Sequence, residues 1–355
     1  MLASHRREQQ SGDMRTQRED PFAEAAAEAR RELVREIAAG GDLQDPAWRA
    51  AFEQVPRHLF VPYFYIGGGG APCSSEAESS GEGGYERLWC EDPDPDCRRR
   101  WLEGAYLDRP LATHVRDGEL VSSASQPSLM AGMLHALEVR DGDSVLEIGA
   151  GTGYNAALLA HRLGDERVTT VDLDEDITEA ARAHLAAAGY HPVVVTGDGA
   201  RGCPWRAPFD AVIATCAVAS VPPEWLAQCR PGARILAPLS TGLIRLRVRD
   251  AEHAEGRFLH TSAYFVPLRG GGGGSPAPVV HTGGLPRRAT DNELFRFLLT
   301  LTAGSLDPHE AYSLWQRERR PARERFGVTV SGEHQWAWLD EPEGPYSWPL
   351  GSPAP

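Results

Sequence analysis

Short apolar segments alternate with helical patterns between residues 116 and 268. We predict strands over the apolar run that carries Glu147 and over 167–172, 193–195, 209–214 and 234–239. Helical patterns lie between them, from near Asn155, over 177–188 and over 223–228. Strands that alternate with helices form right-handed βαβ units, so the pattern predicts an α/β fold with a mostly parallel sheet. Ligands bind such sheets beyond the carboxyl ends of the strands.

Helical patterns also flank this core. Before it, they cover 22–39, where Gly40 and Gly41 stop the helix, and 46–54. After it, we expect a helix over 291–302 and a hairpin whose strands, 327–330 and 335–339, flank a Ser-Gly turn. Four aromatic residues crowd this tail: Trp336, Trp338, Tyr346 and Trp348. They either fill a small core, which their burial preferences favour, or line a peptide groove.

The composition divides the chain into five parts. We expect a disordered tail (1–20), an N-terminal helical segment (21–115) with a long insertion at 67–100, a ligand-binding α/β domain (116–268), a Gly/Pro linker (269–284) and a small C-terminal α+β domain (285–355). The insertion is rich in Gly, Ser and acidic residues, so we expect it to be mobile or wrapped on the surface.

The charge of the chain argues against a nucleic-acid partner. Its 355 residues hold 36 Lys and Arg against 50 Asp and Glu, and a formal net charge of −14 offers no general basic face to a phosphate backbone. No apolar run approaches the roughly 20 residues of a membrane span, and residues 1–21 lack an apolar signal region. We therefore expect a cytoplasmic protein with neither a membrane nor a nucleic-acid partner.

The six cysteines point to reduced thiols, since no secretion signal is apparent. Cys90 and Cys97 flank an acidic, proline-rich loop, but the tight Cys/His spacing of a metal site is missing, so we expect no metal. Cys203, Cys216 and Cys229 fit the role of small core residues.

Residues 145–153 read Val-Leu-Glu-Ile-Gly-Ala-Gly-Thr-Gly and carry the most specific signal. Glycine lacks a Cβ, so Gly149, Gly151 and Gly153 allow a sharp turn and a close approach of ligand, and the next helix points its amides at that turn. A dinucleotide fingerprint has G-x-G-x-x-G, whereas Tyr154 stands at its last glycine position, which disfavours a nicotinamide oxidoreductase. The E-x-G-x-G-x-G form resembles the first motif of S-adenosylmethionine-dependent methyltransferases.

Polar residues end the other strands at the same edge. Asp172 is the candidate acceptor for ribose hydroxyls, with Asp174 close enough to compete, and an N-cap of the next helix is the alternative role. Asp198, in Gly197-Asp198-Gly199, is the candidate acceptor for an adenine amino group. Thr215 and Cys216 follow the fourth strand.

Segments before the glycine turn closely resemble protein-L-isoaspartate O-methyltransferases. They are 55–62, the run Ala-Tyr-Leu-Asp-Arg-Pro-Leu at 105–111, and Ser-Ala-Ser-Gln-Pro at 123–127. The family has Thr-Ile-Ser-x-Pro there, with its serine beside the methyl acceptor. Ser125 matches that serine and Pro127 the proline, while Ser123 and Ala124 replace threonine and isoleucine. The resemblance covers about residues 50–240.

The resemblance implies a Rossmann-like, class I S-adenosylmethionine-dependent methyltransferase fold acting on a peptide or protein that carries Asp or isoAsp. The implied catalytic residue is Ser125. The implied substrate-binding residues are Ser123, Ala124, Gln126, Pro127, Thr215 and Cys216. The implied cofactor-binding residues are Glu147, Gly149, Gly151, Gly153, Tyr154, Asp172, Leu173, Asp198 and Gly199.

The insertion, the tail and Ala124 depart from the minimal repair enzyme. The tail resembles that of actinobacterial relatives from ribosomal-peptide biosynthesis, which implies esterification of an aspartate in a cyclised peptide, followed by succinimide and isoaspartate. Repair of isoaspartyl residues in damaged proteins is the first alternative. A methyltransferase for a small acid and a catalytically silent S-adenosylmethionine- and peptide-binding protein are the others.

Methyl transfer to a carboxylate needs no general base, because a carboxyl group with a pKa near 4 is already ionised at pH 7. The protein has to align oxygen, methyl carbon and sulfur and to exclude water. We expect Ser125 to donate a hydrogen bond to the acceptor carboxylate. Capping of the helix that begins after Pro127 is the alternative role of this serine.

Overall fold

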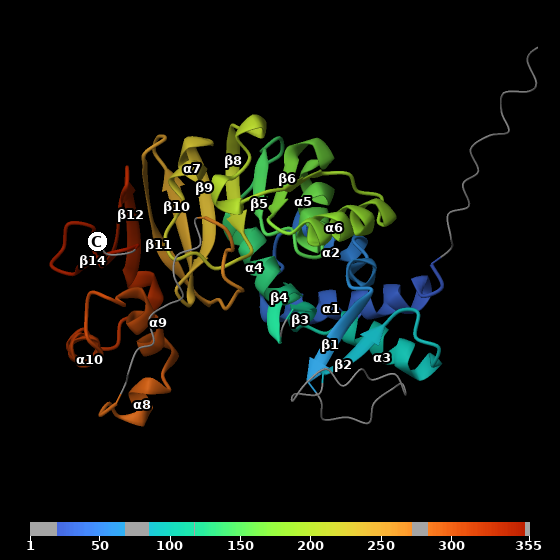
Figure 1. Cartoon of the computed structure of the whole chain (residues 1–355), viewed down its shortest axis with the longest axis horizontal. Coiled ribbons are helices and arrows are strands. Elements are labelled where there is room, and N and C mark those ends of the chain that lie inside the picture. Colours follow the sequence, from blue (N-terminus) through green and yellow to red (C-terminus); the bar gives the residue numbers. More distant parts are fainter. Residues whose placement is uncertain (1–19, 68–84, 117, 272–282, 352–355) are drawn as a thin grey trace, which may run out of the picture.

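A ten-stranded mixed sheet forms the centre of the computed structural model, which describes residues 20–67, 85–116, 118–271 and 283–351 (Figure 1). The strand order is β14-β13-β12-β11-β10-β9-β8-β5-β6-β7. A second sheet has four strands, in the order β2-β1-β3-β4.

The parallel part of the large sheet contains all five predicted strands. These are β5 (Val145–Ile148), β6 (Val168–Asp172), β7 (Val193–Thr196), β8 (Phe209–Ala214) and β9 (Cys229–Leu239). The helices α5 (Tyr154–Leu163), α6 (Glu175–Ala187) and α7 (Pro223–Ala227) lie between them. The predicted α/β fold is confirmed, and its carboxyl edge gathers the ends of β5, β6 and β8.

Antiparallel strands extend the sheet into the tail. They are β10 (Gly242–Val248), β11 (His253–Ser262), β12 (Phe326–Ser331), β13 (His334–Leu339) and β14 (Ser347–Pro349). The predicted tail hairpin is confirmed as β12 and β13. Because β12 pairs with β11, the tail continues the sheet of the α/β core, a connection that the expected linker did not suggest. β10 and β11 were not predicted.

Helices cover both faces of the sheet, and successive residues of a strand alternate between them. On β8, Ala211 and Ile213 pack with the N-terminal helices, whereas Val212 and Ala214 pack with the C-terminal ones. The first group includes α1 (Ala23–Gly40), α2 (Pro46–Gln54) and α4 (Pro127–Leu137). The second includes α9 (Glu293–Leu301) and α10 (Pro308–Arg317), with α8 (Arg287–Thr290) beside them. Figure 1 shows α8, α9 and α10 at the left of the molecule, α1 and α2 to the right of its centre, and α4 between them.

Most of the predicted flanking helices are confirmed. α1 ends at Gly41, whose φ of +93° is the left-handed conformation that glycine adopts readily. Of the tail aromatics, Trp338 and Trp348 are buried, while Trp336 and Tyr346 are half-buried, so the core role fits the first pair. The helices α3 (Pro95–Ala105), α8 and α10 were not predicted.

A small sheet lies beside the large one, and the described residues 85–100 of the expected insertion form its strand β2 and the first part of a helix. Its strands are β1 (Tyr63–Gly67), β2 (Tyr85–Trp89), β3 (Leu111–Arg116) and β4 (Glu119–Ala124), with α3 (Pro95–Ala105) between β2 and β3. The expectation of reduced thiols is wrong at Cys97, which is disulfide-bonded. Cys90, Cys203, Cys216 and Cys229 are free.

Five short 3₁₀ turns complete the described elements: η1 (Arg57–Phe60), η2 (Asp165–Arg167), η3 (Gly199–Arg201), η4 (Pro204–Arg206) and η5 (Arg323–Arg325). The predicted disordered tail falls on residues 1–19, outside the described part, as do 68–84 of the insertion and 272–282 of the linker. Within the described ranges, no helix combines the length and the apolar character that crossing a bilayer requires.

Candidate active site

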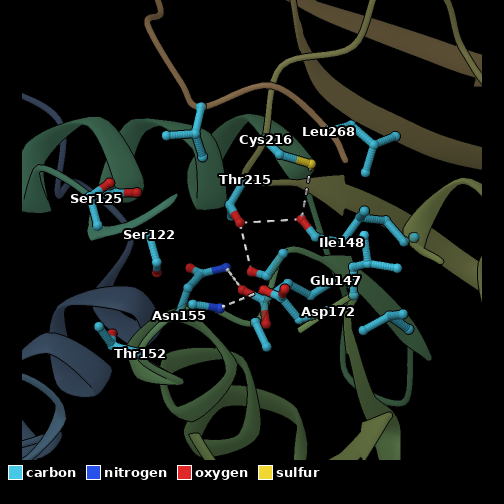
Figure 2. Close-up of a pocket in the computed structure, with 18 of the residues that line it drawn as sticks. Ser122, Ser125, Glu147, Ile148, Thr152, Asn155, Asp172, Thr215, Cys216 and Leu268 are labelled. Carbon is cyan, nitrogen blue, oxygen red and sulfur yellow. Dashed lines mark hydrogen bonds between the residues drawn. The ribbon is translucent and has the colours of Figure 1, made fainter. Parts of the chain in front are cut away.

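A cavity opens at the carboxyl edge of the parallel strands and encloses about 800 Å³, part of it open to solvent (Figure 2). Three groups of residues line it. The first is 121–125 with Met130, the second is the glycine turn with the ends of β5, β6 and β8, and the third is 266–269 after β11. The cavity therefore joins segments from the small sheet, the parallel sheet and the antiparallel extension.

The glycine turn is held by Thr215. Gly149 has a φ of +97°, and a Cβ on it would lie 2.6 Å from the Thr215 hydroxyl oxygen, so only glycine fits. That hydroxyl lies 2.7 Å from the carbonyl oxygen of Gly149 and 3.2 Å from that of Ile148. A hydroxyl has one proton to donate. Thr215 therefore uses its proton on the turn, and its predicted part in substrate binding stays a prediction.

Glu147 lies fully buried at the floor of the cavity. The side-chain amide of Asn155 donates to its Oε1 at 2.7 Å. Burial raises the pKa of Glu147 to about 7, and the nearby Thr170 hydroxyl and the Asn155 amide oppose that rise. Glu147 Oε2 and Asn155 Oδ1 have no hydrogen-bond partner among the described residues. Two buried acceptors without donors suit a ligand that brings polar hydrogens into this part of the cavity.

Asp172 faces the cavity from the end of β6. Its Oδ2 accepts the amide of Gly151 at 3.2 Å, and its Oδ1 accepts the amide of Asp174 at 3.3 Å. Arg269 lies 3.3 Å from the same Oδ1. The alternative role of helix cap belongs to Asp174, whose side chain accepts from the amide of Asp176 at the start of α6. Asp172 thus remains the cavity carboxylate, as expected.

Asp198 is not among the residues that line the cavity, whereas its neighbour Gly199 is. The carboxylate accepts the amide of Ala200 at 3.0 Å and the amide of Gly271, also at 3.0 Å. To contact a ligand as expected, the Asp198 carboxylate would have to release these two amides or accept a further hydrogen bond beside them.

The acceptor side is formed by the end of β4. Ser123, Ala124 and Ser125 line the cavity, whereas Gln126 and Pro127 do not. The capping role considered for Ser125 is wrong: Gln126 occupies the N-cap of α4, and Asp108 accepts the amide of Ser128 at 2.8 Å. No described residue hydrogen-bonds the Ser125 hydroxyl, which leaves it available to a ligand.

Several other residues support or line the wall of the cavity. Buried Arg57 donates to the carbonyl oxygen of Ser125 at 3.1 Å and so ties this loop to η1. Tyr154 lines the cavity as a buried ring, and Leu173 lines it although its side chain is largely exposed. Gly153 caps α5 with a φ of +87° and lies outside the lining. Burial raises the pKa of the Cys216 thiol to about 12, so it is a neutral wall residue.

Sequence reasoning missed Ser122, Asn155 and the segment 266–269. Asn155 stands at the start of the expected helix, one turn from the glycines, and its amide type was the available signal. Leu268 and Arg269 carried no such signal, because Arg269 opens the Gly-rich stretch that composition assigned to a linker. Among the described residues, no cluster of His, Cys, Asp and Glu could hold a metal ion.

Comparison with known proteins gives consistent results. The family model described as protein-L-isoaspartate(D-aspartate) O-methyltransferase matches residues 97–272. A protein-L-isoaspartate O-methyltransferase 1 of Nitrosospira multiformis is 32% identical over 260 residues, which is 71% of this chain and 92% of the relative. A protein-L-isoaspartate O-methyltransferase of Methanoculleus marisnigri is 35% identical over 219 residues, covering 61% and 80% of the two chains.

A solved structure agrees at the level of the fold. A protein-L-isoaspartate O-methyltransferase superposes with a TM-score of 0.57 at 21% identity, covering 91% of this chain and 100% of the solved one.

Proposed function

This chain belongs to the protein-L-isoaspartate O-methyltransferase family, and from that premise we propose that it repairs damaged proteins by esterifying the free carboxyl group of isoaspartyl residues. It is an S-adenosylmethionine-dependent protein carboxyl O-methyltransferase. The observation that carries the proposal is the cavity in which the Ser125 hydroxyl, which no described residue hydrogen-bonds, shares one space with the glycine turn and the carboxylates of Glu147 and Asp172.

The residues of the cavity fit S-adenosylmethionine. The unpaired acceptors Glu147 Oε2 and Asn155 Oδ1 suit the cofactor's polar hydrogens, and the left-handed turn at Gly149 leaves room for close approach. Asp172 would accept from ribose hydroxyls, and exposed Leu173 would contact the base. When bound, the cofactor supplies an electrophilic methyl group on a sulfonium.

Ser125 orients the acceptor. Its hydroxyl would donate a hydrogen bond to one oxygen of the isoaspartyl carboxylate and leave the other free to attack. Arg57, by holding the Ser125 carbonyl oxygen, keeps this loop against the cavity. The carboxylate is ionised at neutral pH, so the cavity needs no base and contributes alignment and exclusion of water.

The ester then reacts without further help from the enzyme. The backbone nitrogen of the next residue attacks the ester carbonyl carbon, methoxide leaves and takes up a proton as methanol, and a succinimide remains. Hydrolysis of the ring gives aspartate or isoaspartate, so repeated cycles move damaged residues back to aspartate.

The comparisons favour this repair role over maturation of a cyclised peptide. The relatives described above are protein-L-isoaspartate O-methyltransferases. The tail was the reason to expect peptide maturation, yet a solved structure of that name aligns with 91% of this chain, so an extended chain occurs there as well. That likeness concerns the fold, and the substrate has to be tested.

The test uses three peptides of one sequence: a linear isoaspartyl peptide, its linear aspartyl counterpart and a cyclised aspartyl peptide. Each is incubated with enzyme and S-adenosylmethionine and followed by mass spectrometry. We expect a gain of one methyl group, then loss of methanol, on the isoaspartyl peptide alone. Reaction of the cyclised aspartyl peptide alone would establish maturation instead. Cofactor binding with no methylation of any peptide would indicate a silent binding protein.

A further inference from the structure

The outward face of the small sheet carries an aromatic surface that nothing in the methyl-transfer site uses. In the β1–β2 register, Tyr63 is opposite Trp89 and Tyr65 is opposite Arg87. Directly opposed residues of antiparallel strands share a face. We call these four residues the aromatic face.

The residues of the aromatic face contact one another. The Arg87 guanidinium lies over the rings of Tyr63 and Trp89, 4.6 and 5.5 Å from their centroids. The Tyr63 and Tyr65 rings meet edge to face at 6.0 Å. Arg87 is exposed and the three rings are half-buried, whereas Phe64 and Leu88, on the opposite side of the strands, are buried. The core is therefore on the other side, and this face is turned to solvent.

The aromatic face leads to the methyl-transfer site. Tyr63 also lines a second cavity of about 620 Å³, together with Phe60, Thr113 and His114. That cavity shares Ser122, Gly151 and Thr152 with the cofactor cavity. The two cavities therefore lie next to each other against the same three residues, and the second one extends to the ring of Tyr63.

The strand register gives the distance between the aromatic face and the acceptor loop that carries Ser123 and Ser125. Ser123 pairs with Ala112, and Ala112 pairs with Tyr65, so these three residues lie in one line across the sheet. Neighbouring strands are about 4.8 Å apart, which puts Tyr65 roughly 10 Å and Arg87 roughly 14 Å from the acceptor loop. An extended chain advances about 3.3 Å per residue, so three to five residues beyond the acceptor would reach the face.

We infer that the aromatic face binds the stretch of substrate polypeptide that flanks the acceptor residue. The inference rests on the proposed function and names the surface that holds the rest of its substrate. Aromatic rings hold an extended backbone and its apolar side chains without demanding one sequence, and Arg87 adds attraction for an acidic residue. Damaged proteins differ in the sequence around the isoaspartyl residue, so the binding surface has to accept many sequences. The family match begins at residue 97, so β1 and β2 lie outside it.

The test measures binding directly, so that it does not depend on turnover. A labelled isoaspartyl peptide with about six residues on each side of the acceptor is titrated by fluorescence anisotropy into protein saturated with S-adenosylhomocysteine. A three-residue isoaspartyl peptide is measured as its competitor. The variants are Tyr65→Ala and Arg87→Ala. Arg99→Ala, on the exposed side of α3, is the matched control.

We expect each variant to weaken binding of the long peptide about fivefold to tenfold, as loss of one aromatic or cation–π contact implies. Affinity for the short peptide and for S-adenosylhomocysteine should stay unchanged, and Arg99→Ala should match the wild type. Equal losses for the long and short peptides, or no loss for the long one, would overturn the inference. So would a wild-type protein that holds the long peptide no more tightly than the short. Wild-type binding without methylation would contradict only the repair function.

Discussion

Arg269 lies 3.3 Å from the carboxylate of Asp172, although 97 positions separate the two residues in the chain. The contact closes the rim of the cofactor cavity from the segment that follows β11. The same segment reaches Asp198 through the amide of Gly271. One stretch of chain thus engages both acidic residues that the sequence assigns to the nucleoside.

We predict that Arg269→Ala weakens binding of S-adenosylhomocysteine about threefold to tenfold. Asp172 is largely enclosed, while Arg269 is 36% exposed, so the ion pair stabilises the rim and is partly screened by salt. Isothermal titration calorimetry at low and high ionic strength measures the effect, which should shrink at high salt. Arg249→Ala, an exposed residue that pairs with Glu255, is the control. Tighter binding by the variant would mean that Arg269 competes with the ribose.

Ser125→Ala should lower kcat about tenfold to a hundredfold, because a hydrogen bond to a charged group contributes about 1.5–3 kcal/mol. Affinity for S-adenosylhomocysteine should not change, since the proposed partner is the acceptor. Single-turnover methylation and calorimetry separate the two. Ser128→Ala, at the second residue of α4 and outside the lining, is the control. A normal kcat with lost cofactor affinity would refute the assigned role.

Gly149→Ala should destabilise the protein by about 1–3 kcal/mol and abolish cofactor binding. Its φ of +97° strains any other residue, and the new Cβ would meet the Thr215 hydroxyl at 2.6 Å. Thermal melting with and without S-adenosylhomocysteine measures both effects. Gly197→Ala is the control, because a Cβ there meets open space and its φ is not positive. A variant that still gains stability from the ligand would contradict the role of this turn.

Glu147 should make the protein less stable as the pH rises. Burial raises its pKa from 4.5 to about 7, so the folded state favours the protonated form. The stability from that form is complete below pH 4.5 and disappears as the pH passes through about 7, a loss of roughly 3 kcal/mol by pH 8. The free energy of unfolding of Glu147→Gln should therefore increase relative to that of the wild type as the pH rises from 5 to 8.

Urea unfolding at the two pH values measures this difference. Glu179→Gln, an exposed position on α6, controls for the general effect of removing a carboxylate. A difference between Glu147→Gln and the wild type that stays constant with pH would show that the buried carboxyl does not titrate in this range.

The parallel sheet and one side of the site could be predicted because their signals are local. Apolar runs with glycines at 149, 151 and 153 specify a strand and a turn within nine residues, and Asp172 ends the next strand. The N-terminus of α10 was also readable: Asp307, Pro308 and Glu310 form a capping box, and its pattern was overlooked.

The remainder depends on contacts between distant segments. Arg269 reaches Asp172 only because the chain after β11 returns to the carboxyl edge of the sheet, and no local sequence pattern predicts that return. The strands β3 and β4 are interrupted by register shifts and only partly buried, so their alternation of apolar and polar residues is weak. Asp198 was predicted from its place after the third strand and its glycine-flanked motif, whereas its bond to the amide of Gly271 joins segments 73 positions apart.

The pairing of β11 with β12 has a consequence for any shortened form of this protein. A chain that stops at Gly271 keeps all but the last residue of the matched family region, yet it leaves β11 as an open edge. It also uncovers Phe258, whose ring centroid lies 4.9 Å from that of Phe297 in α9. An unprotected edge strand beside an exposed apolar patch recruits further copies of itself. The tail therefore protects the protein against self-association. A chain shortened to Gly271 should aggregate before its methyltransferase activity could be measured.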